Sequence, residues 1–217
     1  MSKKLIIFGA GDFGREIMYA AKENKAETFE TVAFVVDENI GNQIGGKLEG
    51  IEIMSLKNAV KRLNEDTYFI IGIGNASVRK KVFEETTVVA PAAKFATIVH
   101  NSAVIMPNVV IEEGVFVGTH TTVAVGSHLK RHAAINQNVS IGHDTVVGEY
   151  SVISPGCVLS GRTKIGNTSF LGSNVVTYPK VSIGSFCSVS ALTSVARNVK
   201  GHNKLILKQN TMTLPNE

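Results

Sequence analysis

Branched aliphatic residues recur at every sixth position through the second half of the chain. In the series that runs from Val99 to Val195, sixteen of the seventeen positions are Val, Ile or Leu, and the exception is Thr177. Their overall frequency would place roughly four or five such residues in the series. A period of six fits neither a helix nor plain strand alternation, but it fits short strands that are joined by tight corners and point one aliphatic side chain inward. The pattern therefore predicts a solenoid.

Other positions of each six-residue unit favour small side chains. The fourth residue after the aliphatic is small or β-branched, as expected inside a narrow prism, at Ala103, Val109, Val115, Thr121, Ser127, Ala133, Cys157 and Thr193. Glycine directly follows the aliphatic residue at Gly118, Gly142, Gly148, Gly166, Gly172 and Gly184. We expect these glycines to lie at corners with positive φ. Where Thr177-Tyr178-Pro179 breaks the series, we expect a small bulge or loop.

The first ninety residues show a different pattern, in which strand-like runs alternate with helical runs. A strand, a glycine turn and a helix are predicted over residues 5–23, strands over 31–39 and 67–75, and helices over 55–63 and 77–85. This order predicts a parallel sheet of about three or four strands, with a ligand crevice at their carboxyl ends. We expect an α/β domain over residues 1–90, a β-helix over 91–199 and a tail over 200–217.

The glycine turn matches a nucleotide-binding pattern. Gly9, Gly11 and Gly14 have the G-x-G-x-x-G spacing, and Asp37 falls near the place where an acidic contact to a ribose would lie. The same glycines are also what a tight strand-to-helix turn needs without any ligand. Because the sheet is short for a full dinucleotide fold, a mononucleotide-sized ligand is favoured.

Composition and charge narrow the functional classes. The formal net charge is only +4, and no basic run interleaved with aromatic residues points to nucleic acid. No apolar run reaches the roughly 18 residues of a membrane span, and the run from Leu5 to Phe8 is too short for a signal peptide. Cys157 and Cys187 occupy small interior positions and suit a reducing compartment. We expect a cytoplasmic protein with no nucleic-acid or membrane partner.

The repeated units resemble those of the hexapeptide-repeat acyltransferases, whose [LIV]-G-x-x-x-x units build a left-handed parallel β-helix with coils of about 18 residues. The resemblance covers Val99 to about Val199, and it alone implies the hand of the coil. With the stretches FGAGDFGRE, VVDEN and FIIGIGNASVRKK, the chain resembles the bacterial acyltransferases of nucleotide-linked amino sugars and the related sialic acid O-acetyltransferases. The implied fold class is an α/β N-terminal domain, with a small parallel sheet and a glycine-turn nucleotide site, followed by a left-handed parallel β-helix.

The resemblance assigns a ligand to each domain. It implies that the N-terminal domain holds the nucleotide-sugar and that the β-helix holds acetyl-CoA. Residues facing the nucleotide and its phosphates correspond to Gly9, Gly11, Gly14, Asp37, Gly72, Gly74, Asn75 and Arg79. Two departures concern the donor, because Val152 stands where many members carry a second histidine and the usual G-x-P-A-K-like C-terminal segment is replaced by GHNKLILKQNTMTLPNE.

Acyl transfer from a thioester needs a base for the acceptor's proton and a donor for the developing oxyanion. Of the six histidines, His120, His132 and His143 fall at predicted corners, and only His143 is directly followed by a carboxylate, Asp144. One coil later, Gly161 would leave a backbone N–H beside this histidine. An exposed corner histidine without a function is the alternative for His143, and it is the favoured interpretation of the other two.

The resemblance extends to this corner. It implies that His143 is the general base, Asp144 its orienting partner, Asn136 a substrate contact and Gly161 a backbone contact to the thioester. The function so indicated is an acyl-CoA-dependent N-acetyltransferase that acts on a nucleotide-linked amino-deoxysugar, with acetyl-CoA as donor and no metal.

Three other functions stay open. The nearest is O-acetylation of a sugar hydroxyl, as in sialic acid modification. A metal enzyme of the carbonic anhydrase type needs three converging histidines, and Asn138 and Pro107 stand where two of them would lie. An NAD-dependent oxidoreductase or a noncatalytic nucleotide sensor would rest on Gly9, Gly11 and Gly14 alone.

Apolar residues also precede the inward aliphatic on several predicted strands. They are Val104, Val110, Phe116, Val146, Val152, Val158 and Phe170. On a three-sided prism these side chains would form flat apolar faces, which seek partners. We therefore expect a homotrimer with the active site between neighbouring β-helices.

Overall fold

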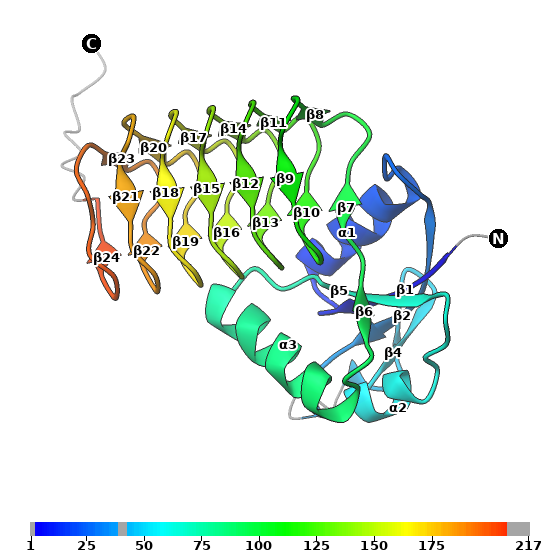
Figure 1. Cartoon of the computed structure of the whole chain (residues 1–217). Helices are drawn as coiled ribbons and strands as arrows, with labels where there is room; N and C mark the ends of the chain where they lie inside the picture. Colours follow the sequence, from blue (N-terminus) through cyan, green and yellow to red (C-terminus); the bar gives the residue numbers. More distant parts are fainter. Residues whose placement is uncertain (1–2, 39–42, 208–217) are drawn as a thin grey trace, which may run out of the picture.

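The computed structural model describes residues 3–38 and 43–207. A six-stranded sheet with three helices comes first, and a stack of short strands follows it (Figure 1). The sheet has the order β3-β4-β2-β1-β5-β6 and is parallel except for the β3–β4 pair. Its strands are β1 (Lys3–Phe8), β2 (Phe29–Val35), β3 (Lys47–Leu48), β4 (Ile51–Met54), β5 (Thr67–Ile71) and β6 (Lys94–Phe95), and its helices are α1 (Asp12–Lys22), α2 (Leu56–Val60) and α3 (Ala76–Val89).

Both faces of this sheet are covered, as the alternation along β1 shows. Leu5 and Ile7 are fully buried in a cluster with Ile17 of α1. Ile6 and Phe8 point the other way, into a cluster that also contains residues of α2 and α3. Because the central strands are parallel, their carboxyl ends meet at one edge, where α1 and α3 also begin.

The sheet is larger than the sequence pattern predicts. The three predicted strands and three predicted helices are present, but β3 and β4 add a hairpin whose turn residues, Glu49 and Gly50, have φ +50° and +79°. Positive φ at both turn positions is typical of a two-residue hairpin. The Glu-Gly pair between two apolar runs is the feature of the sequence that could have predicted this hairpin. Strand β6 pairs with β5 beyond residue 90, and the domain boundary expected there stays a prediction.

The rest of the described chain is a parallel β-helix of three sheets. The first sheet contains β7 (Ile98–Val99), β10 (Phe116–Val117), β13 (Ala134–Ile135), β16 (Val152–Ile153), β19 (Phe170–Leu171), β22 (Ser188–Val189) and β24 (Lys204–Leu205). The second contains β8 (Val104–Ile105), β11 (Thr122–Val123), β14 (Ser140–Ile141), β17 (Val158–Leu159), β20 (Val176–Thr177) and β23 (Ser194–Val195). The third contains β9 (Val110–Ile111), β12 (His128–Leu129), β15 (Val146–Val147), β18 (Lys164–Ile165) and β21 (Ser182–Ile183).

The pairing confirms the predicted solenoid. Residues 18 positions apart lie side by side, as Val117 and Ile135 do in the first sheet. The aliphatic series fills the interior in one continuous cluster, together with the small residues of each unit. Cys157 and Cys187 are buried in this cluster as expected, and burial raises the pKa of the Cys157 thiol to about 11.

Thr177 continues the repeat, and the expected bulge is absent. It lies in the regular strand β20 with its side chain fully buried. Its hydroxyl lies 2.9 Å from that of Thr163 and accepts a hydrogen bond from the backbone N–H of Ser160 at 3.1 Å. The prediction was wrong because an inward threonine is tolerated where a second hydroxyl satisfies it.

The glycines that follow the aliphatic residues do not have positive φ, so that prediction was also wrong. Positive φ occurs two positions later, for example at His120, Asp144 and Tyr150. The glycines are instead needed for close backbone approach between coils. An added Cβ at Gly142 would lie only 2.6 Å from the backbone nitrogen of Gly161.

The N-terminal domain packs against the first sheet of the β-helix. Phe13 of α1 meets Phe116 edge-on, with ring centroids 5.5 Å apart. Ala76 of α3 packs in a cluster with Ala134 and Val152. The expectation that Phe116 and Val152 form a free apolar face was therefore wrong, because the chain's own N-terminal domain buries them.

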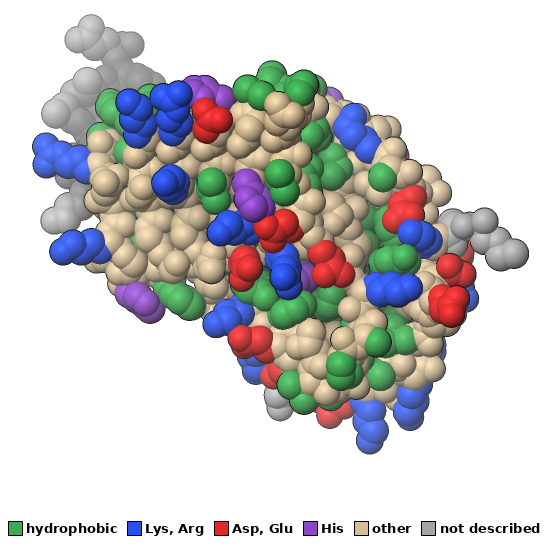
Figure 2. Space-filling view, viewed as in Figure 1, with side chains coloured by type: hydrophobic (Ala, Val, Ile, Leu, Met, Phe, Trp, Pro, Cys, Tyr) green, Lys and Arg blue, Asp and Glu red, His purple; other side chains and the backbone are tan. Residues whose placement is uncertain are grey.

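Part of the expected apolar surface does remain exposed on the other two sheets. Val104, Val110 and Val158 are 54%, 52% and 40% exposed. In Figure 2, charged side chains gather where the β-helix meets the N-terminal domain, and much of the β-helix face carries none.

The end of the described chain joins the β-helix. Strand β24 pairs with β22, so Lys204 and Leu205 of the expected tail extend the first sheet. Residues 208–217 of that tail lie outside the described residues. Within residues 3–38 and 43–207, no helix is both long and apolar enough to cross a membrane.

Candidate active site

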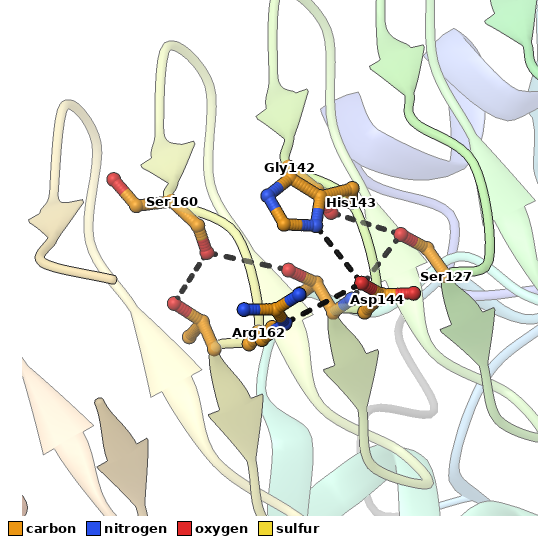
Figure 3. A network of polar contacts seen from close by, with 8 residues as sticks. Ser127, Gly142, His143, Asp144, Ser160 and Arg162 are labelled. Atoms are coloured by element: carbon orange, nitrogen blue, oxygen red, sulfur yellow. Dashed lines mark hydrogen bonds and ion pairs between the residues drawn. The ribbon is translucent and has the colours of Figure 1, made fainter. Parts of the chain in front are cut away.

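The corner between β14 and β15 brings His143 and Asp144 together. The His143 Nδ1 atom lies 2.9 Å from the Asp144 Oδ2 atom (Figure 3). Asp144 has φ +55°, a left-handed conformation that aspartate tolerates better than most residues. With Nδ1–H donating to the carboxylate, the imidazole Nε2 keeps its lone pair available to a substrate.

Asp144 is held in its ionised form by two neighbours. The hydrogen bond from His143 lowers the pKa of the Asp144 carboxyl, and Arg162 acts in the same direction, with its Nε atom 3.6 Å from Oδ2. Arg162 occupies the same corner position one coil later, and its backbone N–H donates to the His143 carbonyl at 2.8 Å. All three side chains are about half exposed, so the corner is formed in the single chain and open to solvent.

Two glycines leave room for this pair. An added Cβ at Gly161, in the coil after His143, would collide with the imidazole Nε2 atom. An added Cβ at Gly126, in the coil before Asp144, would lie 2.6 Å from the carboxylate Oδ1 atom. Sequence reasoning selected Gly161 by its one-coil offset from His143 and missed Gly126, although the same offset joins Gly126 to Asp144.

Buried hydroxyl groups anchor the corner from inside (Figure 3). The Ser127 hydroxyl donates to the Gly142 carbonyl at 2.9 Å, and the Thr145 hydroxyl donates to the Ser160 carbonyl at 3.3 Å. Both hydroxyl residues are fully buried. These bonds tie adjacent coils together on either side of His143 and keep its backbone fixed.

Asn136 lies at a different corner, between the first and second sheets. It is buried, and its side-chain amide donates to the Ile153 carbonyl of the next coil at 3.0 Å. The structure does not bring Asn136 beside His143 within one chain, and its role as a substrate contact stays a prediction.

His132 is a buried aromatic residue in this structure. Its ring stacks on Tyr150, with centroids 5.4 Å apart, and lies 4.4 Å from that of Phe83. Burial lowers the pKa of His132 to about 3, and the positive charges of Arg79 and Arg131 act in the same direction. Because the imidazole is buried and neutral, it cannot take a proton from a substrate in solvent.

Two other histidines have carboxylate partners that sequence adjacency does not reveal. The His128 Nε2 atom lies 2.5 Å from the Glu112 Oε1 atom, and the His100 Nε2 atom lies 3.4 Å from the Glu23 Oε2 atom. A neighbouring carboxylate is therefore not unique to His143. What distinguishes His143 is its open corner and the glycine in the next coil.

A crevice of about 970 Å³ lies at the carboxyl ends of β1, β2 and β5. Of the residues expected there, it is lined by Gly9, Gly11, Asp37, Gly72 and Gly74. Gly9 has φ +97°, and a Cβ at Gly14 would collide with the Gly9 carbonyl, so these two glycines are required by the turn itself. A Cβ at Gly11 or Gly74 would meet nothing within 4 Å. The fold does not need glycine at these two positions. Close approach of a ligand to the backbone would explain why both are glycine.

The structure places Asn75 and Arg79 outside the crevice lining. The Asn75 side chain caps α3 by accepting the Val78 N–H at 3.0 Å. Arg79 is fully buried and donates to the carbonyls of Ile71 and His132, each at 2.6 Å. Its burial lowers the pKa of the guanidinium to about 9. Arg79 therefore joins the N-terminal sheet to a corner of the β-helix.

Sequence reasoning missed the residues of α3 that do line the crevice. They are Val78, Lys81, Val82 and Glu85, which follow the spacing of one helix face. This helical spacing is the feature of the sequence that places Lys81 on the crevice face of α3 and Arg79 on another face. Among the described residues, no group of three His, Cys, Asp or Glu side chains could hold a metal ion.

Comparison with known proteins agrees with this two-part organisation. Residues 4–86 match the PglD N-terminal domain family. A GDP-perosamine N-acetyltransferase of Escherichia coli O157:H7 is 29% identical over 132 residues, which cover 59% of this chain and 58% of that relative. The match thus spans little more than half of the relative's length.

Solved structures share the fold over almost the whole chain. The acetyltransferase domain of PglB from Neisseria gonorrhoeae has a TM-score of 0.82 at 24% identity, with 94% of this chain and 96% of that chain covered. PerB from Caulobacter crescentus, in complex with CoA and GDP-perosamine, has a TM-score of 0.79 at 24% identity, with 91% of each chain covered.

These similarities confirm the fold class, an α/β domain followed by a left-handed parallel β-helix. The family match covers the N-terminal domain, and the structural matches extend through the β-helix. The chain therefore shares the fold of these acetyltransferases, and its N-terminal domain matches the PglD N-terminal domain family.

Proposed function

We propose that this protein is an acyl-CoA-dependent N-acetyltransferase that acetylates the amino group of a nucleotide-linked amino-deoxysugar. The observation that carries the proposal is the His143–Asp144 pair, oriented at an open corner with Gly161 in the next coil. The names of the relatives support it, because one is a GDP-perosamine N-acetyltransferase and a PglB acetyltransferase domain is solved with acetyl coenzyme A.

The corner supplies what acyl transfer to an amine requires. The His143 Nε2 atom takes a proton from the amine as its nitrogen attacks the thioester carbon. The carbon–nitrogen bond forms, the carbon–sulfur bond breaks, and the CoA thiolate leaves and takes up a proton. Asp144 stabilises the imidazolium formed in this step. The N–H of Gly161, which makes no hydrogen bond to another described residue, is the donor for the developing oxyanion.

The crevice of the N-terminal domain suits the nucleotide of the acceptor. Its volume is in the range of small-molecule sites, and Gly11 and Gly74 leave backbone open where the fold does not require glycine. Helix α1 starts at the crevice without a side-chain cap, so its first N–H groups can face phosphate oxygens.

The topology separates base and crevice within one chain. The N-terminal domain covers the first sheet, whereas His143 lies on the corner between the second and third sheets. In a three-sided prism, that corner is opposite the covered face. An active site between chains of a homotrimer would bring them together, and the exposed apolar residues of the second and third sheets supply contact surface.

The test is an acceptor panel that separates N- from O-acetylation. Thermal shifts with CoA and with UDP-, GDP- and dTDP-linked amino sugars would select the acceptor, and thiol release from acetyl-CoA would report transfer. The matching hydroxy sugars and sialic acid serve as controls. We expect turnover with an amino sugar only, and turnover with hydroxyl acceptors alone would contradict the proposal.

A further inference from the structure

The crevice of the N-terminal domain has the wrong overall charge for a phosphorylated ligand. Four carboxylate side chains line it, those of Asp12, Asp37, Glu38 and Glu85. Among the described residues of the lining, Lys81 is the one cation. These carboxylates would repel the negative charge of a nucleoside diphosphate, so its phosphates need a positive group close by.

Of the helices that begin at the crevice, α1 and α3 differ in what they offer an anion. At α3, the Asn75 side chain already accepts the Val78 N–H at 3.0 Å. At α1, the N-cap is Gly11 and makes no side-chain hydrogen bond. Helix α1 has 11 residues and therefore presents both free N–H groups and the positive end of its dipole.

Lys81 is a solvent-accessible cation on the crevice side of α3. It lies one turn after Val78 on the helix face that lines the crevice, and its side chain is 62% exposed. Its one ion pair is long, with Nζ 3.5 Å from the Glu85 Oε1 atom. A phosphate oxygen can displace such a partner, since an exposed i,i+4 pair contributes little.

We propose that Lys81 is the diphosphate-binding cation of the acceptor site and that Glu85 opposes it. This inference rests on the proposed function, because it takes the ligand to be a nucleotide-linked sugar. The diphosphate would lie between the N-terminal end of α1 and the Lys81 ammonium group. Arg79, to which the family resemblance assigns a contact with the nucleotide and its phosphates, is occupied by backbone carbonyls.

The chain provides a matched control one residue away. Lys80 and Glu84 form the same i,i+4 pair, at 3.6 Å, but neither lines the crevice. Calorimetric titration with GDP, UDP and dTDP identifies the diphosphate that binds, and Lys81→Gln should weaken its binding by about tenfold, in line with a hydrogen bond to a charged group. Lys80→Gln should leave binding unchanged. Titration with the corresponding nucleoside should give the same affinity for Lys81→Gln as for wild type.

Replacing the Glu85 carboxylate should change the affinity for the diphosphate in the opposite direction. Glu85→Gln should tighten diphosphate binding several-fold, because it frees Lys81 and removes a negative charge, whereas Glu84→Gln should not. Equal affinity of wild type and Lys81→Gln would overturn the inference and leave the proposed function standing. If none of GDP, UDP and dTDP bound the wild-type protein, the inference would fall together with the nucleotide part of the proposed function.

Discussion

His143 stands at an open corner, where its Nε2 atom lies beside Gly161 and its Nδ1 atom meets the Asp144 carboxylate. Replacing it by Asn should lower kcat by roughly 10² to 10⁴, the usual contribution of a positioned base. The fold should persist, because this side chain is half exposed and contributes nothing to the interior. Steady-state kinetics at saturating substrates, with a melting curve as control, is the measurement. Retention of more than about a tenth of wild-type turnover would exclude His143 as the base.

A substitution of Asp144, at the same corner, should lower kcat less than the substitution of His143. Asp144→Asn removes the negative charge and keeps a side chain of similar shape, so the imidazole remains but its orientation and charge stabilisation suffer. We expect a smaller loss of kcat than for His143→Asn. A larger loss would mean that the carboxylate itself touches the reacting groups.

Gly126 is a positioning residue for Asp144. Gly126→Ala would place a methyl group against the carboxylate, 2.6 Å from Oδ1, and would also strain a residue at φ +72°. Gly156 is the matched control, because it has φ +71° at an equivalent corner and lies beside Asn174 instead. Both alanine variants should lose about 1 kcal/mol of stability or more, and only Gly126→Ala should lower kcat. If Gly126→Ala lost no more activity in an Asp144→Asn background, the effect would be assigned to the carboxylate.

At the scale of the element, the corners of the β-helix form columns of stacked residues. One column contains Gly114, His132, Tyr150, Thr168 and Phe186, all with positive φ. His132 lowers the stability of this column, since both of its ring nitrogens are buried without a hydrogen-bond partner among the described residues. Phe186 shows that phenylalanine fits this backbone position at φ +57°.

This column predicts a pH-dependent stability. The pKa of His132 is about 3 in the folded protein against 6.5 in an unfolded chain, so the unfolded state binds more protons between these values. Stability should therefore fall as the pH drops from 6.5 towards 3, by about 2 kcal/mol at pH 5 from this residue alone. His132→Phe should remove that loss and match or exceed wild-type stability at pH 7. Urea unfolding at pH 5 and pH 7 is the check, and an unchanged difference between the two pH values would contradict the assignment.

At the scale of the whole molecule, His143 lies on the corner opposite the sheet that the N-terminal domain covers, and its separation from the crevice predicts active sites that are shared between chains. Two inactive variants, His143→Asn and Gly11→Phe, should recover activity when they are co-expressed, because a mixed trimer can combine an intact corner from one chain with an intact crevice from another. Gly11→Phe should fold, since an added Cβ there meets nothing within 4 Å. Light scattering gives the oligomeric state. A stable monomer at micromolar concentration, or no recovery in mixed assemblies, would contradict the trimer.

The sequence by itself determined the β-helix and the position of His143 within it. A six-residue period of aliphatic residues leaves one geometry in which all of them point inward, and an 18-residue coil then places His143 beside Gly161 by counting alone. Such repeats are local, because each unit packs only against its neighbours. The strands and helices of the first ninety residues could be predicted for the same reason, since each has its own periodicity.

Only the tertiary structure decided which surfaces are free and which polar side chains are available. The docked N-terminal domain buries Phe116 and Val152, and it turns Arg79 from an expected phosphate ligand into an interdomain donor. His132 becomes a neutral core residue because α3 covers its corner with Phe83. Helical periodicity separates Arg79 from the crevice-lining face of α3, but the partner that each of these side chains meets depends on contacts between segments far apart in the chain.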